Sequence, residues 1–264
     1  MAIGDDGALL GFLAATVGGS PGSFVAKVRL HQHAACGDDA RMTYRHMYRA
    51  LSEQLVEIGC FEHTVAVAVD RPEVVNAFVE LSFGFDQIKG LRSMTPPDDA
   101  RAQRVHAAGD VVLRAAVPGD LARIVDLTWE LQQFHAEAPM LRPAVVDMKA
   151  LRGDLSAGIA DENRLVLLAE HEARVAGLMV VDPDGHIPAA ATIGIAVVTA
   201  AVRGRALGTA LLSGAADWAA TRGFRRLCAG WTSANLVSDA FWRGHGFVPV
   251  RYTLTRRIDP RVKA

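Results

Sequence analysis

The feature that most constrains the fold is an order of elements that occurs twice in the chain. In the first half, the helix-like "TYRHMYRALSEQLVEIG" is followed by a strand "HTVAVAV", a helix "EVVNAFVEL" and an extended "FDQIKGLRSM". In the second half, a helix after "VRGRALG" is followed by a strand "RRLCAGW", a short helix "SDAFWRGH" and an extended "FVPVRYTLTRRI". Placing Gly59 on Gly223, an offset of 223 minus 59, or 164, superimposes both series without gaps. The sequence therefore predicts an α/β (α+β) chain with two units of similar topology.

The first unit is incomplete relative to the second. Nothing before "DDGALLGF" corresponds to the roughly 55 residues from Val111 to Leu165, so the first unit is either reduced or begins upstream. The segment "TPPDDARAQRVHAAGD" has the Pro, Ala and charged composition of a linker. We expect a partial domain over residues 1–95, a linker over 96–109 and a complete domain over 110–264.

Composition restricts the function classes. With 28 Lys and Arg against 29 Asp and Glu, the net charge of -1 supplies no field for nucleic acid or an anionic membrane. No apolar run reaches the length of a membrane span, and the N-terminus lacks the basic start of a signal peptide. Three widely spaced cysteines fit neither a disulfide framework nor a CxxC metal site. We expect a cytoplasmic protein without nucleic-acid, membrane or metal partners.

The chemistry of the second unit is concentrated in "VRGRALGTALL", which lies between the apolar "TIGIAVV" and a helix. A strand-to-helix turn leaves the first backbone N–H groups of the helix unpaired at its positive end, which makes an anion site. Glycines let the backbone approach a phosphate, and arginines add charge. A solvated turn before a helix is the alternative interpretation. The pattern fits neither GxxxxGK[ST] nor GxGxxG, so nucleoside triphosphate and dinucleotide ligands are disfavoured.

These residues resemble the GNAT superfamily of acetyl-CoA-dependent N-acetyltransferases. The family's pyrophosphate loop, Arg/Gln-x-x-Gly-x-Gly/Ala, resembles "RGRALG" at Arg203 to Gly208, with Ala206 where the family usually has glycine. A second family motif, Asn-x-x-Ala-x-x-x-Tyr-x-x-x-Gly-Phe, resembles "NLVSDAFWRGHGF", with Ser238 for alanine and Trp242 for tyrosine. The resemblance covers residues 110–257, and the first half looks like a degenerate copy, as in tandem members of the superfamily.

The resemblance implies a mixed twisted sheet with flanking helices, splayed between its fourth and fifth strands, "ATIGIAVV" and "RRLCAGW". It implies acetyl-CoA as the co-substrate, with pantetheine along the splayed strand and pyrophosphate on the turn. Asn235 would contact the pantetheine arm, although its residue type fits a helix N-cap equally well. The cofactor contacts implied are Ala196, Val198, Arg203, Gly204, Arg205, Ala206, Gly208, Thr209, Asn235 and Trp242.

The acid and base of the reaction are less evident. The family often uses tyrosine to protonate the departing sulfur, and the indole of Trp242 in that place cannot deliver a proton. Ser238, one helical turn earlier, could position a water or simply be a first-turn residue. Glu170 and Asp182 could act as bases or be solvated acids at strand ends. His245 is expected to complement the dipole at a helix C-terminus.

The first half is expected to lack this cofactor, because its matching loop, "DDARMT", carries acids where the second half has arginine. His31 and His33 could face one side of a strand as metal ligands, but no third ligand is evident. The expected function is an N-acetyltransferase that acts on a primary amine of a small molecule or protein. The alternative is a non-catalytic acyl-CoA-binding or scaffold protein, and a homodimer is compatible with either.

Overall fold

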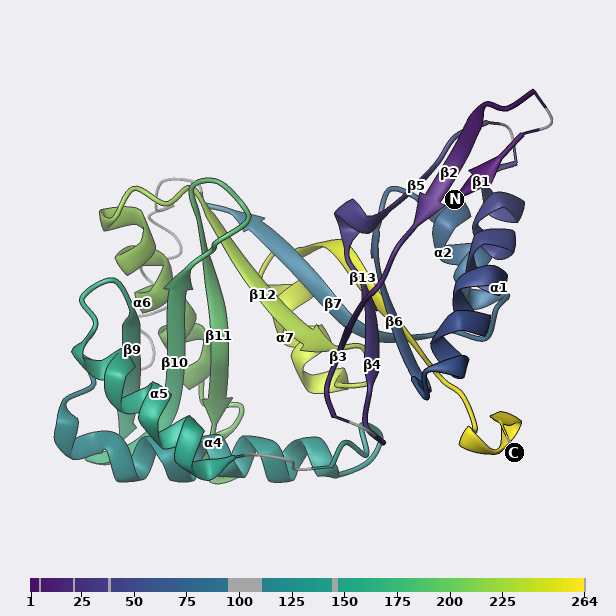
Figure 1. Ribbon diagram of the computed structural model, residues 1–264. Coiled ribbons are helices and arrows are strands. Elements are labelled where there is room, and N and C mark those ends of the chain that lie inside the picture. The colour runs from purple at the N-terminus through teal and green to yellow at the C-terminus, as the bar shows by residue number, and fades with distance from the viewer. Residues whose placement is uncertain (5, 21, 38, 95–110, 144–146, 264) are drawn as a thin grey trace. The chain divides into compact units, whose positions relative to one another are not determined.

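The computed structural model describes residues 1–264 except 5, 21, 38, 95–110, 144–146 and 264, and the expected linker at 96–109 falls within these exceptions. The chain forms two compact units (Figure 1). Unit 1 comprises Met1–Lys89, Trp231–Ser233 and Pro249–Ala264, and unit 2 comprises Gly90–Gly230 and Ala234–Val248. The chain passes between the units inside strands β7 (Gly84–Ser93), β12 (Arg226–Thr232) and β13 (Val248–Arg257), and between Ser233 and Ala234.

Unit 1 contains a mixed sheet and a small second sheet. Strands β3, β4, β6 and β13 are neighbours in that order, with β4 parallel to β6 and β13 antiparallel to it. A second sheet has the order β1-β2-β5. The aromatic rings of Tyr44, Tyr48, Phe78 and Phe83 lie at the centre of the core. The elements are β1 (Ala2–Ile3), β2 (Leu9–Leu13), β3 (Thr16–Gly18), β4 (Val25–Val28), β5 (His33–Ala35), α1 (Ala40–Glu57), β6 (Glu62–Ala68), α2 (Pro72–Val79) and β13 (Val248–Arg257).

Unit 2 contains an antiparallel meander extended by one parallel strand. Its order is β8-β9-β10-β11-β12, in which only the β11–β12 pair is parallel. The remaining elements are β8 (Val111–Ala115), α4 (Leu121–Ala136), α5 (Met148–Ala160), β9 (Leu165–His171), β10 (Arg174–Pro183), β11 (Ala190–Val198), α6 (Leu207–Thr221) and α7 (Leu236–Gly244).

Helices cover both faces of this sheet. Ile124 and Leu127 of α4 and Leu155 of α5 pack against side chains of β9, β10 and β11. On the other face, α6 packs closely enough that a Cβ built on Gly177 of β10 would lie 2.9 Å from Leu211 Cδ1. The sheet and its helices hold the N-terminal end of α6 beside the C-terminal end of β11.

The expected repeat is visible in the element boundaries. An offset of 164 places β6 on β12 and β7 on β13 residue for residue, and it places the end of α1 on the end of α6. One strand, β13, departs from the expected domain boundary at residue 110. Residues 249–257 of β13 pair with β6 in unit 1, where Arg251 lies opposite Ala68 and Arg257 opposite Glu62. The end of the second half therefore belongs to the core of unit 1.

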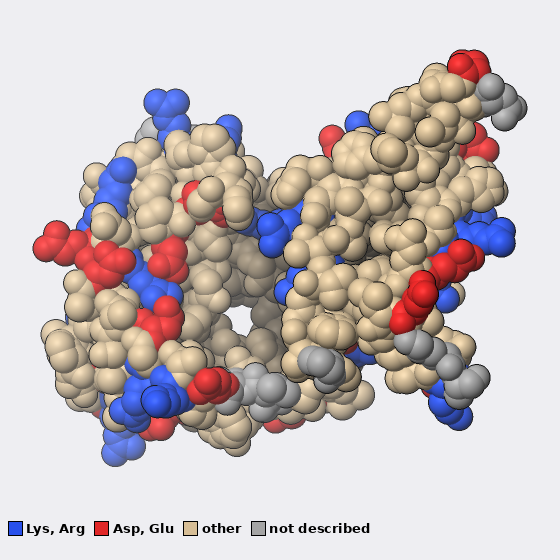
Figure 2. All heavy atoms as spheres, viewed as in Figure 1, with Lys and Arg blue, Asp and Glu red and all other residues tan. Residues whose placement is uncertain are grey.

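Figure 2 shows acidic and basic side chains next to one another over the α5 side of unit 2 on the face in view. Within the described residues, no helix is both long enough and apolar enough to span a bilayer.

Candidate functional site

The sheet of unit 2 opens between β11 and β12, as the resemblance implies. The two strands pair in parallel only from Ala190 opposite Arg226 to Ile193 opposite Ala229. Beyond Ile193 the strands diverge, and Figure 1 shows them separating from their shared end. Among the described residues, the last positions of β11 therefore have no strand partner on that side, and their peptide groups can bond to a ligand.

A β-bulge marks the start of the opening. On the other side of β11, Val180 pairs with Ile195 and Val181 with Ile193, so Gly194 is the extra residue. A bulge redirects the strand and takes one residue out of the ladder. The bulge thus lies where β11 leaves β12, two residues before Ala196, which lines the pocket described next.

The turn that follows β11 leads into helix α6, whose N-terminus has no side-chain cap. Gly204 and Ala206 both have left-handed backbone angles, with φ values of 80° and 61°. No side chain caps α6, and its first backbone hydrogen bond runs from Ala210 N to the carbonyl of Ala206. The N–H groups of Leu207, Gly208 and Thr209 have no partner among the described residues. Three unpaired donors at the positive end of a helix form an anion site.

A pocket of about 470 Å³ joins this helix end to the splayed part of β11. Most of its lining side chains are apolar, and within the part of the chain that the structure describes Arg203 is the one charged residue among them. A long ligand with an anionic group at one end and an apolar arm would fit these surfaces. The lining residues are Leu131, Phe134, Met179, Ala196, Val197, Val198, Val202, Arg203, Gly204, Ala206, Leu207, Gly208, Thr209, Leu211, Asn235, Val237, Ser238, Phe241 and Trp242.

The two arginines of the turn have different positions. The guanidinium of Arg203 lies 4.5 Å from the ring centroid of Phe134, and its Nε donates to the Val198 carbonyl at 3.2 Å. Arg203 therefore lies at the pocket, against the edge of β11. Arg205 does not line the pocket, and its Nη1 lies 3.1 Å from Nε2 of His171 on β9. Of the expected cofactor contacts, Arg205 is the one that the structure places outside the lining.

Helix α7 brings three expected residues to the pocket. Asn235 is its N-cap, because Oδ1 accepts from Ser238 N at 3.0 Å, and it also lines the pocket while being only 3% exposed. Both interpretations of Asn235 are thus compatible with the geometry. Ser238 and Trp242 line the same wall, and Trp242 is held edge-on between Phe241 and Phe247.

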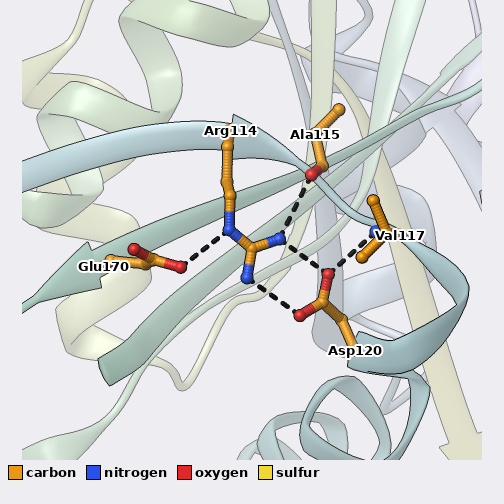
Figure 3. Close-up of polar contacts among 5 residues, drawn as sticks. All are labelled: Arg114, Ala115, Val117, Asp120 and Glu170. Atoms are coloured by element: carbon orange, nitrogen blue, oxygen red, sulfur yellow. Dashed lines mark hydrogen bonds and ion pairs between the residues drawn. The ribbon is translucent and has the colours of Figure 1, made fainter. Parts of the chain in front are cut away.

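Glu170 is away from the pocket. Its carboxylate accepts from Arg114 Nε at 2.7 Å, and the same guanidinium binds both oxygens of Asp120 at 2.7 and 2.9 Å (Figure 3). Asp120 also accepts from Val117 N at 2.8 Å. The hydrogen bonds from Arg114 hold the pKa of Asp120 below its usual value, and the two acids raise the pKa of Arg114. This cluster ties β8 to β9 and to the start of α4, so the geometry assigns Glu170 a structural role rather than that of a base.

Asp182, at the end of β10, lies nearer than Glu170 to the opening between β11 and β12, because it is next to the bulge residue Gly194. Its Oδ1 lies 2.9 Å from Arg164 Nε, and its Oδ2 lies 3.8 Å from a Cβ built on the bulge residue Gly194. Burial raises the pKa of Asp182 above its ordinary value, against the opposing effect of Arg164. Asp182 is not among the pocket-lining residues.

Sequence reasoning missed the aromatic walls and one hydrogen bond. Phe134 and Phe241 line the pocket from α4 and α7, and a Cβ on Gly208 would lie 3.2 Å from Phe241 Cε2. His245 does end α7, as expected, with Nδ1 on the Phe241 carbonyl at 2.7 Å. It also reaches Thr209 Oγ1 with Nε2 at 3.1 Å. The hydrophobic spacing of α4 and α7 could have indicated the aromatic walls, whereas nothing in the sequence pattern indicates the Thr209–His245 contact.

The residues of unit 1 that are equivalent to the start of α6 make hydrogen bonds within their own unit. The 164 offset places Tyr44 of α1 on Gly208, and Tyr44 Oη lies 2.9 Å from His33 Nδ1. His33 lies on β5, and its Nε2 is 2.8 Å from the Ala66 carbonyl on β6. Asp39 caps α1 by accepting from Met42 N. Burial raises the pKa of Tyr44 to about 12 and lowers that of His33, so both stay neutral near pH 7. His33 is thus a partly buried residue whose ring nitrogens contact a tyrosine and a carbonyl.

Comparisons with known proteins agree with this geometry. The acetyltransferase (GNAT) family model matches residues 124–247. No curated protein matches the sequence. Among solved structures, a GCN5-related N-acetyltransferase from Sphaerobacter thermophilus is similar at 15% identity and a TM-score of 0.63, over 97% of this chain and 78% of that one.

Two further structures have the same fold. A GNAT-family acetyltransferase from Colwellia psychrerythraea is 12% identical, with a TM-score of 0.58 over 89% of this chain and 81% of that one. A tandem GNAT protein from the clavulanic acid biosynthesis pathway is 17% identical, with a TM-score of 0.51 over 95% and 80% of the two chains. The splayed sheet, the uncapped helix and the family match together show that residues 124–247 of this chain belong to the GNAT acetyltransferase family.

Proposed function

We propose that unit 2 binds acetyl-CoA and transfers its acetyl group to a primary amine of a small molecule or protein. One observation carries this proposal. The pocket runs without interruption from the three unpaired N–H groups of α6 to the part of β11 that has left β12. These two ends match the two ends of an acyl-pantetheine diphosphate.

Each part of the pocket has a role in this proposal. The N–H groups of Leu207, Gly208 and Thr209 take the diphosphate, with Arg203 adding positive charge. The peptide groups of Ala196 and Val198 bond the pantetheine arm in the manner of a strand. The side chain of Asn235 contacts that arm, and Trp242 supplies an apolar wall.

The acceptor amine has to be neutral to react. A lysine-like amine with a pKa of about 10.4 is neutral in only about one part in several thousand at pH 7. A free thiol has a pKa of about 8.5, so a thiolate is a tolerable leaving group without an acid, whose help typically contributes about 10² to 10⁴ in rate. The pocket lining contains no carboxylate, histidine, cysteine or tyrosine within the described chain. We therefore propose a slow transfer without a general acid, in which Ser238 positions a water. Asp182, whose Oδ2 lies 3.8 Å from a Cβ built on the bulge residue Gly194, is the acid that lies near the bulge.

Release of free thiol from acetyl-CoA in the presence of an amine panel tests the proposal, with calorimetric titration of acetyl-CoA in parallel. Arg203→Ala should weaken binding about three- to tenfold, because the arginine is exposed and its interaction is screened. Arg222→Ala is the matched control, because Arg222 lies at the other end of α6 against Trp218. Equal affinities for both variants would contradict the assignment of the turn.

A non-catalytic acyl-CoA-binding protein is the second candidate. The observation that favours it is Trp242, which is 4% exposed in the place where family members often have tyrosine. An indole N–H donates a hydrogen bond but cannot supply a proton to a thiolate. Tight binding of acetyl-CoA with no thiol release above the buffer rate, for every amine tested, would establish this second function and refute the first.

A further inference from the structure

The hydroxyl of Thr209 at the start of α6 is tied to a histidine. His245 Nε2 lies 3.1 Å from Thr209 Oγ1, and the other ring nitrogen, Nδ1, lies 2.7 Å from the Phe241 carbonyl. The imidazole also packs against the Phe241 ring, with centroids 4.3 Å apart and the two planes tilted by 39°. Thr209 and Phe241 line the pocket, whereas His245 lies behind them.

The Phe241 carbonyl determines which nitrogen of the His245 ring carries a hydrogen. A carbonyl oxygen only accepts, so His245 Nδ1 must carry a hydrogen to make the 2.7 Å contact. In the neutral ring, Nε2 then has no hydrogen and can only accept from Thr209. The single hydroxyl hydrogen of Thr209 therefore points at His245, and only oxygen lone pairs remain for the pocket. An anion at the helix end would meet an acceptor there rather than a donor.

Adding a proton to His245 reverses this hydrogen bond. The imidazolium has hydrogens on both nitrogens, so Nε2 donates to Thr209 Oγ1 and Nδ1 still donates to Phe241. The Thr209 hydroxyl hydrogen is then free to rotate toward the pocket. His245 is the C-cap of α7, where the helix dipole also accommodates a cation.

The charged groups on α6, α7 and the turn before α6 are the following. Arg243 and Asp239 on α7 pair with each other at 2.8 Å. Asp217 lies about two turns beyond Thr209 on α6. The turn before α6 contributes Arg203, which lies on Phe134, and Arg205, which contacts His171.

We propose that His245 couples binding of the coenzyme A diphosphate to uptake of a proton, by switching Thr209 from an acceptor to a donor toward the pocket. This inference rests on the proposed function, and His245 is a positioning residue that acts through Thr209. By linkage, a ligand that binds the protonated form better takes up a proton, and its affinity falls as the pH rises.

Calorimetry with 3′-dephospho-CoA measures the coupling directly. This probe keeps the diphosphate but lacks the 3′-phosphate monoester, whose own second pKa near 6 would add proton exchange in the same range. Titrations at one pH in buffers with different ionisation enthalpies give the number of protons taken up. We expect uptake of a fraction of one proton on binding, and an affinity about tenfold higher at pH 6 than at pH 8.

Three variants identify the residues responsible. His245→Gln keeps a hydrogen-bonding side chain but cannot titrate, so proton uptake should vanish and the affinity should vary less than twofold with pH. Thr209→Val removes the hydroxyl and should abolish most of the pH dependence, whereas Thr209→Ser should retain it. Thermal unfolding of each variant shows that the fold is intact.

The outcomes separate this inference from the proposed function. If the wild-type chain binds the probe without proton uptake, or if His245→Gln takes up as many protons as the wild type, this inference is overturned and the binding function stands. If the wild-type chain binds neither the probe nor acetyl-CoA, both are overturned.

Discussion

Replacing Gly208 with alanine adds one methyl group at the point where the diphosphate is proposed to approach α6. A Cβ at this position would lie 3.2 Å from Cε2 and 3.5 Å from Cζ of Phe241. The first distance is shorter than ordinary van der Waals contact, so the ring has to move by a few tenths of an ångström. The Phe241 ring is packed against Trp242 and His245, and these contacts limit how far the ring can move away from an added Cβ.

The expected effect on stability is small, and the effect on binding is large. Alanine in place of a helical glycine stabilises by up to about 1 kcal/mol, while overpacking costs about 1 to 3 kcal/mol. These terms largely cancel in the free energy of unfolding. The methyl group and the displaced ring remain in the pocket, so the affinity for acetyl-CoA should fall by about ten- to a hundredfold, equivalent to about 1.4 to 2.8 kcal/mol.

The assay pairs calorimetric titration of acetyl-CoA with urea unfolding. Gly153→Ala on α5 is the matched control, because a Cβ at Gly153 meets nothing within 4 Å. The control should raise the free energy of unfolding by about 0.5 to 1 kcal/mol and leave the affinity unchanged. A folded Gly208→Ala variant with wild-type affinity would refute the claim that a ligand contacts this end of α6.

Four further predictions follow from the same geometry. Arg203→Ala should weaken acetyl-CoA binding about three- to tenfold by calorimetry, and unchanged affinity would show that the turn does not bind the diphosphate. Trp242→Phe should change the rate of acetyl transfer less than tenfold, and a hundredfold loss would show that the indole N–H takes part in the chemistry. Ala206→Gly should raise the free energy of unfolding by up to about 1 kcal/mol, because alanine is strained at a φ of 61°, and a loss of more than 1 kcal/mol would contradict that reasoning. Burial lowers the pKa of His33 and His63, so the unfolded chain binds more protons below about pH 6.5, and the melting temperature should fall between pH 7 and pH 5; a melting temperature that rises over that range would contradict the neutral state of these residues.

Local patterns in the sequence predicted most of the fold. The ungapped offset between Gly59 and Gly223 gave the right equivalence of elements, because helix and strand periodicity and the glycine stops are local properties. The pairing of β13 with β6 was not predictable in this way. The two strands β7 and β13 have equivalent patterns, so the sequence alone does not tell which neighbour each one takes.

The candidate site shows the same division between local and distant information. Nine of the ten cofactor residues implied by the resemblance line one pocket, because they are grouped on the end of one strand, the turn after it and one helix. The hydrogen bond between Glu170 and Arg114 could not be predicted, because the two residues are 56 positions apart in the chain. The Thr209–His245 contact spans 36 residues, and no periodicity indicates a hydrogen bond between two helices.

A crystal structure of the full chain with bound coenzyme A tests the central claim most directly. The account predicts diphosphate oxygens within hydrogen-bond distance of the N–H groups of Leu207, Gly208 and Thr209, and pantetheine alongside Ala196 to Val198. Density for the diphosphate elsewhere on the protein, or this pocket closed by the protein's own side chains at saturating ligand, would contradict it.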